Sequence, residues 1–352
     1  MKTIRDIDVK NKTILLRADY NVPIKDGKIV NDLRIRASLP TINYLLEHGA
    51  KRIFIISHLG RPDGKINMDF TLSPVAKTLQ KLLPGQTVGF YPLPSDSALA
   101  SKIPEQTKIA LLENLRFEPG EEANDPDFIQ TIIQATDADI YVQDGFAVAH
   151  RAHASTDAIK KFLPIYAGLL IEQEITNLEN ITKNPVRPML LIIGGAKAED
   201  KQPLIEKFTK IADQIVVGGK IAADEYKSQD PKIYVAEDFD ENSKGEKLDI
   251  GPISTAKLAD KITDAKTIIW NGLLGYAEDP AYATSSTITA ELLGEKSDAT
   301  TIICGGDTTS FVENLIKEHP ALSYSLVSTG GGASLEYLLG KKLPGLEAIK
   351  HS

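Results

Sequence analysis

The stretch RPMLLIIGGAKAEDK, residues 187–201, runs from an apolar segment through a glycine pair into a segment with helical spacing. Its apolar part shows no alternation of polar and apolar residues, a pattern typical of a strand that is buried on both faces. Similar apolar runs at 214–217, 267–271 and 300–304 are each followed by glycine. Because these runs alternate with helical patterns, the sequence predicts an α/β fold with helices on both faces of a parallel sheet.

A second array of the same kind comes earlier in the chain. Apolar runs at 13–21, 51–58, 108–116 and 138–145 alternate with helical patterns that include 33–46 and 126–135. Two successive arrays in 352 residues predict two α/β domains. The stretch GLLIEQEITNLENITKNP, residues 168–185, predicts a helix that joins them, and an ordinary crossover helix is the alternative.

Composition excludes several classes of protein. Hydrophobic residues make up 42% and charged residues 25%, close to the average of soluble globular proteins. No run of 18 apolar residues occurs, and the charged opening MKTIRDIDVKNK has no apolar core of a signal peptide, so we expect neither a membrane span nor secretion. A single cysteine, Cys304, fits a cytoplasmic protein. A net charge of −8 without a basic stripe argues against nucleic acid as a partner.

Arginine is unevenly distributed, since all nine arginines lie within the first 187 residues. Guanidinium groups bind carboxylate and phosphate through two parallel hydrogen bonds. In open parallel sheets, ligands bind beyond the carboxyl ends of the strands. Polar and basic residues gather at those ends in the first half, and five of the nine arginines lie at or near this one edge, which predicts an arginine-rich anion site there. The residues at the strand ends are Asp19, Asn21, His58, Gly60, Arg61, Glu113, Asn114, Arg116, Asp144, His150, Arg151 and His153, with Arg34 in the first helical turn after a loop. A solvated surface position is the alternative for any one of these arginines.

The second half instead ends its strands in glycine, at 194–195, 218–219, 272, 305–306 and 330–332. Glycine lets the backbone approach a ligand, and a helix that starts there points free N–H groups at an anion. Lys197 and Lys201 follow one such turn, and Asp307, placed to hold Mg²⁺ beside phosphates, follows another. One glycine pair is usually structural, but several together with lysines and an acid predict a polyphosphate site.

Two common nucleotide signatures are missing. The chain has no GxxxxGK[ST] and no GxGxxG, so it is neither a P-loop protein nor a carrier of the dehydrogenase fingerprint. His58, His150 and His153 lack the spacing of a zinc site, and we expect them to orient a substrate or tune charge.

Nine blocks, in order along nearly the whole chain, resemble phosphoglycerate kinase: LLRADYNVP, SHLGRPDG, LLENLRFEPGEE, AHRAHAST, GGAKAEDK, DIGP, IIWNG, GGDT and STGGGASLEYLLGKKLPG. The resemblance implies two Rossmann-like domains around a cleft, joined by a hinge helix. It also implies a monomeric glycolytic kinase that transfers a phosphoryl group directly and in line between 1,3-bisphosphoglycerate and Mg-ADP, giving 3-phosphoglycerate and ATP. The expected boundaries are 1–167 for the acid-substrate domain, 168–185 for the hinge, 186–336 for the nucleotide domain and 337–352 for a returning C-terminal segment.

The resemblance also assigns roles to residues of this sequence. The acid-substrate site would consist of Asp19, Asn21, Arg34, His58, Arg61, Arg116 and Arg151. The groups that contact the transferred phosphoryl would be Arg34, Lys197, Gly330 and Gly331. The nucleotide site would consist of Gly195, Lys197, Lys201, Gly219, Leu248, Asn271, Glu278, Gly305, Gly306, Asp307 and Thr308, with Asp307 as the magnesium ligand. No general base is expected, because the acceptor oxygen is already ionised at neutral pH.

Some positions depart from the family pattern. Lys220 stands where the family has glycine followed by methionine, Leu273 replaces the proline of WNGP, and QDGFAVAH differs from NDAFGTAH. The segment between residues 220 and 249 is shorter than in typical members. We therefore expect weak discrimination between ATP and GTP, unless Ile221, Tyr226 and Leu248 rebuild the wall of the base pocket. A binding protein without turnover and an unrelated α/β dehydrogenase are the rival functions.

Overall fold

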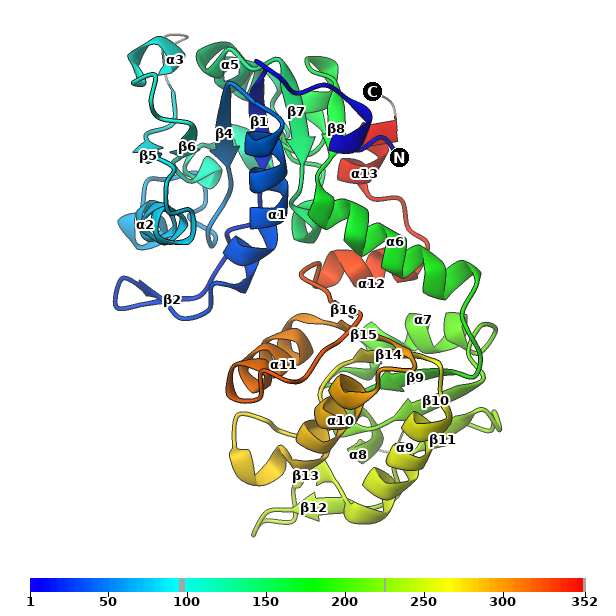
Figure 1. Cartoon of the computed structure of the whole chain (residues 1–352). Coiled ribbons are helices and arrows are strands. Elements are labelled where there is room, and N and C mark those ends of the chain that lie inside the picture. Colours follow the sequence, from blue (N-terminus) through cyan, green and yellow to red (C-terminus); the bar gives the residue numbers. More distant parts are fainter. Residues whose placement is uncertain (95–98, 225, 351–352) are drawn as a thin grey trace. The chain divides into compact units, whose positions relative to one another are not determined.

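The computed structural model describes residues 1–94, 99–224 and 226–350 (Figure 1). The chain forms two compact units. Unit 1 contains Met1–Gln173 and the C-terminal segment that begins at Lys342, and unit 2 contains Glu174–Lys341. Each unit contains a six-stranded sheet in which all neighbouring strands are parallel, as the sequence predicts.

In unit 1 the strand order is β5-β6-β4-β1-β7-β8, so the direction of winding reverses between β1 and β7. The strands are β1 (Thr13–Arg17), β4 (Arg52–Ile56), β5 (Val88–Tyr91), β6 (Ile109–Leu112), β7 (Ile140–Gln143) and β8 (Ile165–Ala167). The helices are α1 (Leu33–Glu47), α2 (Ser73–Leu82), α3 (Leu99–Lys102), α4 (Pro119–Glu122), α5 (Pro126–Thr136) and α13 (Pro344–Lys350). A small hairpin, β2 (Ile24–Lys25) with β3 (Lys28–Ile29), precedes α1.

In unit 2 the strand order is β11-β10-β9-β14-β15-β16, which is the 3-2-1-4-5-6 order of a dinucleotide-binding sheet when strands are numbered along the chain. The strands are β9 (Met189–Ile193), β10 (Gln214–Val217), β11 (Ile233–Val235), β14 (Thr267–Asn271), β15 (Thr300–Cys304) and β16 (Leu326–Val327). The helices are α7 (Ala198–Phe208), α8 (Gly219–Ala223), α9 (Pro252–Asp264), α10 (Thr284–Glu295), α11 (Gly306–Glu318) and α12 (Gly332–Leu338). The hairpin of β12 (Phe239–Glu241) and β13 (Lys247–Ile250) lies outside the sheet.

The central strands of both units are buried along nearly their whole length. All five residues of β1, β9 and β14 are buried, which requires cover on both faces of the sheet. The only tryptophan, Trp270, lies on β14 with no exposed surface, and its indole N–H donates to the Gly272 carbonyl at 2.8 Å. The core of each unit is therefore built from the apolar runs that the sequence showed.

The helix α6 (Leu169–Lys183) carries the boundary between the two units. Its first turn belongs to unit 1, where the Asp144 carboxylate accepts the N–H groups of Leu170 at 3.0 Å and Ile171 at 3.4 Å. The C-terminal helix α13 packs beside β8 in unit 1, and the Gly345 N–H donates to the Ala149 carbonyl at 2.9 Å (Figure 1). The domain boundaries given above remain predictions.

Every strand expected from the apolar runs is present, including β11 and β16, which correspond to the runs KIYVAED at 232–238 and YSLVSTGGG at 324–332. The elements that were not predicted are the edge strands β5 and β8, both hairpins, and the helices α2, α3, α4, α8, α10 and α13. None of the described helices combines the length and the apolar character that crossing a membrane requires.

Candidate active site

A buried arginine organises the carboxyl end of the unit 1 sheet. Arg17, the last residue of β1, is only 1% exposed. Its guanidinium donates to the Ser155 hydroxyl at 2.9 Å and lies 3.2 Å from Nδ1 of His58. Arg17 is not among the site residues predicted from the sequence, although an arginine within the apolar run TILLR is a signal in itself, because a buried charge needs partners.

Asp19, two residues beyond the end of β1, forms an ion pair with Arg34 of α1. The Asp19 carboxylate is nearly buried and accepts a hydrogen bond from the Arg34 guanidinium, whose side chain is 29% exposed. The Asn21 side-chain carbonyl accepts the Gly60 N–H at 2.9 Å, so it ties the loop after β1 to the loop after β4. Arg34 thus keeps exposed donors while one end of its guanidinium is held in place.

Arg116 and Arg61 differ in their surroundings. Arg116 is buried, donates to the Gly60 carbonyl at 2.7 Å and pairs with Glu122 at 3.0 Å. Arg61 follows Gly60 directly and is exposed. Arg151 is half-buried in the loop after β7. The structure thus brings two types of arginine to this edge, one fixed by protein groups and one open to solvent.

The pKa values of the histidines at this edge are lowered by burial and by the positive charge of the arginines around them. Burial lowers the pKa of His58 well below its usual value, and four nearby guanidinium groups lower it further: Arg17, Arg116, Arg34 and Arg151. Burial, followed by the charges of Arg116 and Arg151, also lowers the pKa of His153, to about 4. Both imidazoles are therefore neutral at pH 7, and an anion bound at this edge would relieve the repulsion among the arginines.

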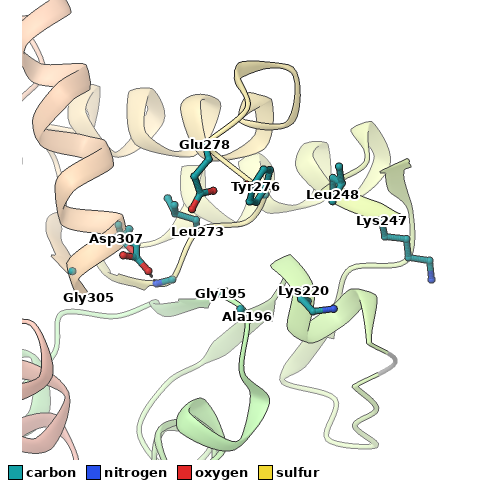
Figure 2. A pocket seen from close by; sticks show the side chains of 14 residues that line it. Gly195, Ala196, Lys220, Lys247, Leu248, Leu273, Tyr276, Glu278, Gly305 and Asp307 are labelled. Atoms are coloured by element: carbon teal, nitrogen blue, oxygen red, sulfur yellow. Dashed lines mark hydrogen bonds between the residues drawn. The ribbon is translucent and has the colours of Figure 1, made fainter. Parts of the chain in front are cut away.

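In unit 2 a pocket of about 290 Å³ opens beyond the carboxyl ends of β9 and β14, the strands between which the winding direction reverses. Parallel α/β sheets bind ligands at this position. The pocket is lined by Gly195, Ala196, Lys220, Lys247, Leu248, Gly272, Leu273, Gly275, Tyr276, Glu278, Gly305, Gly306, Asp307 and Thr308 (Figure 2).

One end of the pocket is polar. Asp307 lies there in the first turn of α11, beside Gly305 (Figure 2). The Thr308 hydroxyl accepts the Gly272 N–H at 2.8 Å, and Asn271 next to it accepts a hydrogen bond from the Lys201 ammonium. Nδ2 of Asn271 is buried and has no hydrogen-bond partner among the described residues. A buried donor without a partner fits a site whose acceptor arrives with a ligand.

The other end is partly apolar. Leu248 and Tyr276 lie on one side of it, and Ala196 lies on the opposite side, whereas Leu273 lies beside Asp307 (Figure 2). Lys220 and Lys247 lie at the end away from Asp307. Of the three residues named for an alternative wall, only Leu248 lines the pocket. Ile221 is 1% exposed and belongs to the buried core, because α8 packs it inward.

The glycines at the strand ends fall into two groups. A Cβ atom on Gly194 would lie 2.2 Å from the Leu273 carbonyl oxygen, and one on Gly272 would lie 2.1 Å from the Gly194 carbonyl oxygen. Gly219, with φ +62°, is crowded in the same way by Leu273. These three glycines let the strand ends pack backbone to backbone. Around Gly306 and Gly331, by contrast, a Cβ would meet nothing within 4 Å.

Several expected nucleotide residues lie outside the pocket lining. Lys197 is exposed and directly precedes α7. Gly219 packs against the backbone of Leu273 and does not line the pocket. Gly330 is buried and Gly331 half-buried at the start of α12. Lys201 and Asn271 lie directly behind the lining, where a Cβ on Gly195 would be 3.9 Å from the Lys201 side chain.

The comparisons agree with this geometry. A family model described as phosphoglycerate kinase matches residues 4–235 and 222–341. The chain belongs to the phosphoglycerate kinase family. The phosphoglycerate kinases of Fervidobacterium nodosum and Moorella thermoacetica are each 37% identical to it, over 99% of this chain and 98% of the relative.

Solved structures show the same fold. The structure of phosphoglycerate kinase from Coxiella burnetii is 30% identical, with a TM-score of 0.78 over 99% of this chain and 98% of that one. The enzyme from Pyrococcus horikoshii is 27% identical, with a TM-score of 0.84 over 100% and 99%. The chain is therefore a kinase of the glycolytic phosphoglycerate kinase family, whose nucleotide substrate carries magnesium. The two matched ranges overlap at residues 222–235.

Proposed function

We propose that the arginines of unit 1 bind 3-phosphoglycerate or 1,3-bisphosphoglycerate, and that the pocket of unit 2 binds Mg-ADP or Mg-ATP. The observation that carries the proposal is the position of Asp307 beside Gly305 and Gly306, at the start of α11 and at the point where the winding of the sheet reverses. A helix N-terminus with an acid in its first turn suits a metal-bound polyphosphate.

The acid substrate would be held by the fixed and the exposed groups together: Asp19, Asn21, Arg34, His58, Arg61, Arg116 and Arg151. Arg116 and Arg17 already have protein partners, so they would attract the anion through their positive electrostatic potential. Arg61 and the exposed side of Arg34 are available for direct hydrogen bonds to it. Because His58 is neutral, it takes part in hydrogen bonding without adding charge.

Magnesium fits the donor set on the nucleotide side. Among residues 1–94, 99–224 and 226–350 no cluster of three or more His, Cys, Asp or Glu side chains could hold a metal. Mg²⁺ is usually bound by one or two carboxylates together with substrate phosphates and water, so Asp307 suits an ion that arrives with the nucleotide. When bound, the ion neutralises phosphate charge. Lys201 and the buried Nδ2 of Asn271 would bind phosphate oxygens.

Transfer would be direct and in line, because the attacking carboxylate or phosphate oxygen is already ionised and needs no base. Arg34, Lys197, Gly330 and Gly331 are the proposed contacts of the moving phosphoryl group, whose charge they would stabilise. Domain closure about α6, which would exclude water from the acyl phosphate, remains a prediction. We also infer a cytoplasmic monomer that acts on small molecules.

A coupled assay of ATP formation from 1,3-bisphosphoglycerate and ADP, run over a magnesium titration, tests the proposal. Asp307→Asn should raise the magnesium concentration needed for half-maximal rate at least about tenfold, since it removes the charged ligand. Asp260→Asn, on the exposed face of α9, is the matched control. If Asp307→Asn keeps the wild-type magnesium midpoint, the metal assignment is wrong, and if the wild type forms no ATP, the binding protein without turnover is the better reading.

A further inference from the structure

Two lysines line the end of the nucleotide pocket that lies away from Asp307 (Figure 2). Lys220 is the second residue of α8, and Lys247 is the first residue of β13. They come from separate elements on either side of the opening. The charges on the pocket walls are thus divided, with carboxylate at the phosphate end and ammonium at the other.

Among the residues that the structure describes, neither ammonium group has a buried partner. Lys220 pairs with Asp224 at 2.9 Å, but the two side chains are 60% and 57% exposed. The Lys247 ammonium lies 4.8 Å from the centre of the Phe239 ring. Exposed ion pairs and exposed cation–π contacts are both weak, so a ligand acceptor can replace them at small cost.

The walls of the pocket decide which part of a nucleotide meets these lysines. Asp307, Gly305 and Gly306 define the phosphate end. The side chains of Leu248 and Tyr276 form a surface opposite Ala196 that suits a flat ring (Figure 2). A purine held there directs one edge outward, toward the end that carries the lysines. Glu278 lies nearer to Asp307, so it does not face that edge.

We propose that Lys220 and Lys247 shift the base preference of this enzyme toward 6-oxopurine nucleotides, those of guanine and hypoxanthine. The inference rests on the proposed nucleotide site. Lysine carries three donors and no acceptor. Guanine presents two acceptors on this edge, O6 and N7, whereas adenine presents the N6 amino donor beside N7. An ammonium group therefore gains a hydrogen bond with a 6-oxopurine and meets a second donor with adenine.

The test is the ratio of dissociation constants for ADP, GDP and IDP, measured by calorimetry without the acid substrate. The wild type should bind GDP and IDP at least as tightly as ADP. Lys220→Met and Lys247→Met keep the apolar length of the side chain and remove the ammonium. Each should weaken GDP and IDP relative to ADP by about three- to tenfold, the effect of one net hydrogen bond.

Lys210→Met is the matched control, because Lys210 is exposed in unit 2 outside the pocket lining and its loss removes the same charge. IDP lacks the 2-amino group of GDP, so equal effects on both ligands show that O6 and N7 are recognised. The inference is overturned if both variants leave the ratios unchanged, if only GDP responds, or if the wild type prefers ADP more than tenfold. Turnover with ATP and 3-phosphoglycerate, measured on the same preparations, tests the proposed function separately from these ratios.

Discussion

The nine arginines do different work even though the sequence places them in one half of the chain. Arg17 and Arg116 are buried in the cluster at the carboxyl end of the unit 1 sheet. Arg52 lies at the opposite end of the same sheet, where it donates to four backbone carbonyls, and Arg187 pairs with Asp213 in unit 2 at 2.6 Å. A count of arginines therefore predicts that an anion site exists, but burial and partners decide which arginines belong to it.

Arg34→Ala should lower kcat by about 10³–10⁵, the effect of removing an arginine that stabilises a phosphoryl transition state, and should leave ADP affinity nearly unchanged. Steady-state kinetics and calorimetry measure the two quantities. Because the substitution also leaves the nearly buried Asp19 carboxylate without its ion pair, circular dichroism must first show that the variant is folded.

The matched control for Arg34 is Arg36→Ala. Arg36 lies on the same helix, is exposed, and pairs with Asp32 at 3.0 Å. We expect its removal to change kcat less than about threefold, because an exposed i,i+4 pair contributes little. An Arg34→Ala enzyme that retains more than a tenth of the wild-type kcat would contradict a role in the transition state.

Arg61→Lys and Arg116→Lys should both raise KM for 3-phosphoglycerate without changing KM for ATP. Lysine lacks the two parallel donors of a guanidinium, which Arg61 can offer to the substrate and which Arg116 uses to hold the substrate loop at Gly60. The structure adds a difference between them. Arg116→Lys also loses the hydrogen bond to Gly60 and the geometry of the Glu122 pair, so it should lower thermal stability as well. Equal changes in both KM values would refute the separation of the two substrates between the units.

At the scale of elements, the glycine-ended strands serve two purposes that one pattern cannot distinguish. Gly194, Gly219 and Gly272 are required where β9, β10 and β14 end against one another, since a Cβ there would overlap backbone atoms. Gly306 has free space around it and starts α11 at the pocket. A glycine turn thus predicts a ligand only when the space beside it is empty, which requires the structure.

The start of α6 is held by a carboxyl group in an unusual environment. Asp144 is fully buried and its Oδ1 accepts two N–H groups of the first turn, while its Oδ2 has no hydrogen-bond partner among the described residues. Burial raises the pKa of Asp144 to about 7, and the hydrogen bonds only partly offset this. The folded state therefore holds a proton that the unfolded chain releases near pH 4.

It follows that the contribution of Asp144 to the free energy of unfolding falls between about pH 4 and pH 7, because ionisation of Asp144 increasingly favours the unfolded state. Asp144→Asn keeps a cap for α6 and removes this loss. We expect its stability relative to wild type to rise by about 1–3 kcal/mol between pH 5 and pH 8, measured by urea unfolding.

Asp69→Asn, at an exposed carboxylate, is the control for Asp144 and should show no such change. The depressed pKa values of His58 and His153 give the opposite dependence, a loss of stability as the pH falls below about 6.5, and they act equally on both proteins. The effect of Asp144 is therefore the difference between the free energies of unfolding of the variant and the wild type at each pH. A difference that stays constant from pH 5 to pH 8 would mean that Asp144 ionises normally in the folded state.

At the scale of the whole molecule, the sequence predicted the two α/β arrays and the central strands, because long buried strands are apolar on both faces. The edge strands β5 and β8 were missed, since they are short and partly exposed and so lack that pattern. The order of the strands in each sheet could not be predicted either, because hydrophobic periodicity describes each element alone and does not say which strands are neighbours. The rule that ligands bind at the carboxyl ends of parallel strands did locate most of the candidate site residues.

The parts of the site that escaped prediction are those formed by distant segments. Lys247 and Tyr276 reach the pocket only because β13 and the loop after β14 fold over it, and neither lies in a recognisable motif. Glu121 is fully buried and holds the Ser155 hydroxyl at 2.6 Å, a contact 34 residues apart that supports Arg17. Such contacts depend on tertiary packing, which local sequence does not specify.

The position of Trp270 gives this chain a built-in optical label. Its indole is the only one in the protein, it is fully buried on β14, and the next residue, Asn271, lies behind the nucleotide pocket. Tryptophan emission therefore follows the melting of unit 2 alone, whereas far-ultraviolet circular dichroism follows both units. Curves that coincide in urea would show that the two units unfold as one cooperative body, and curves that separate would give each unit its own transition.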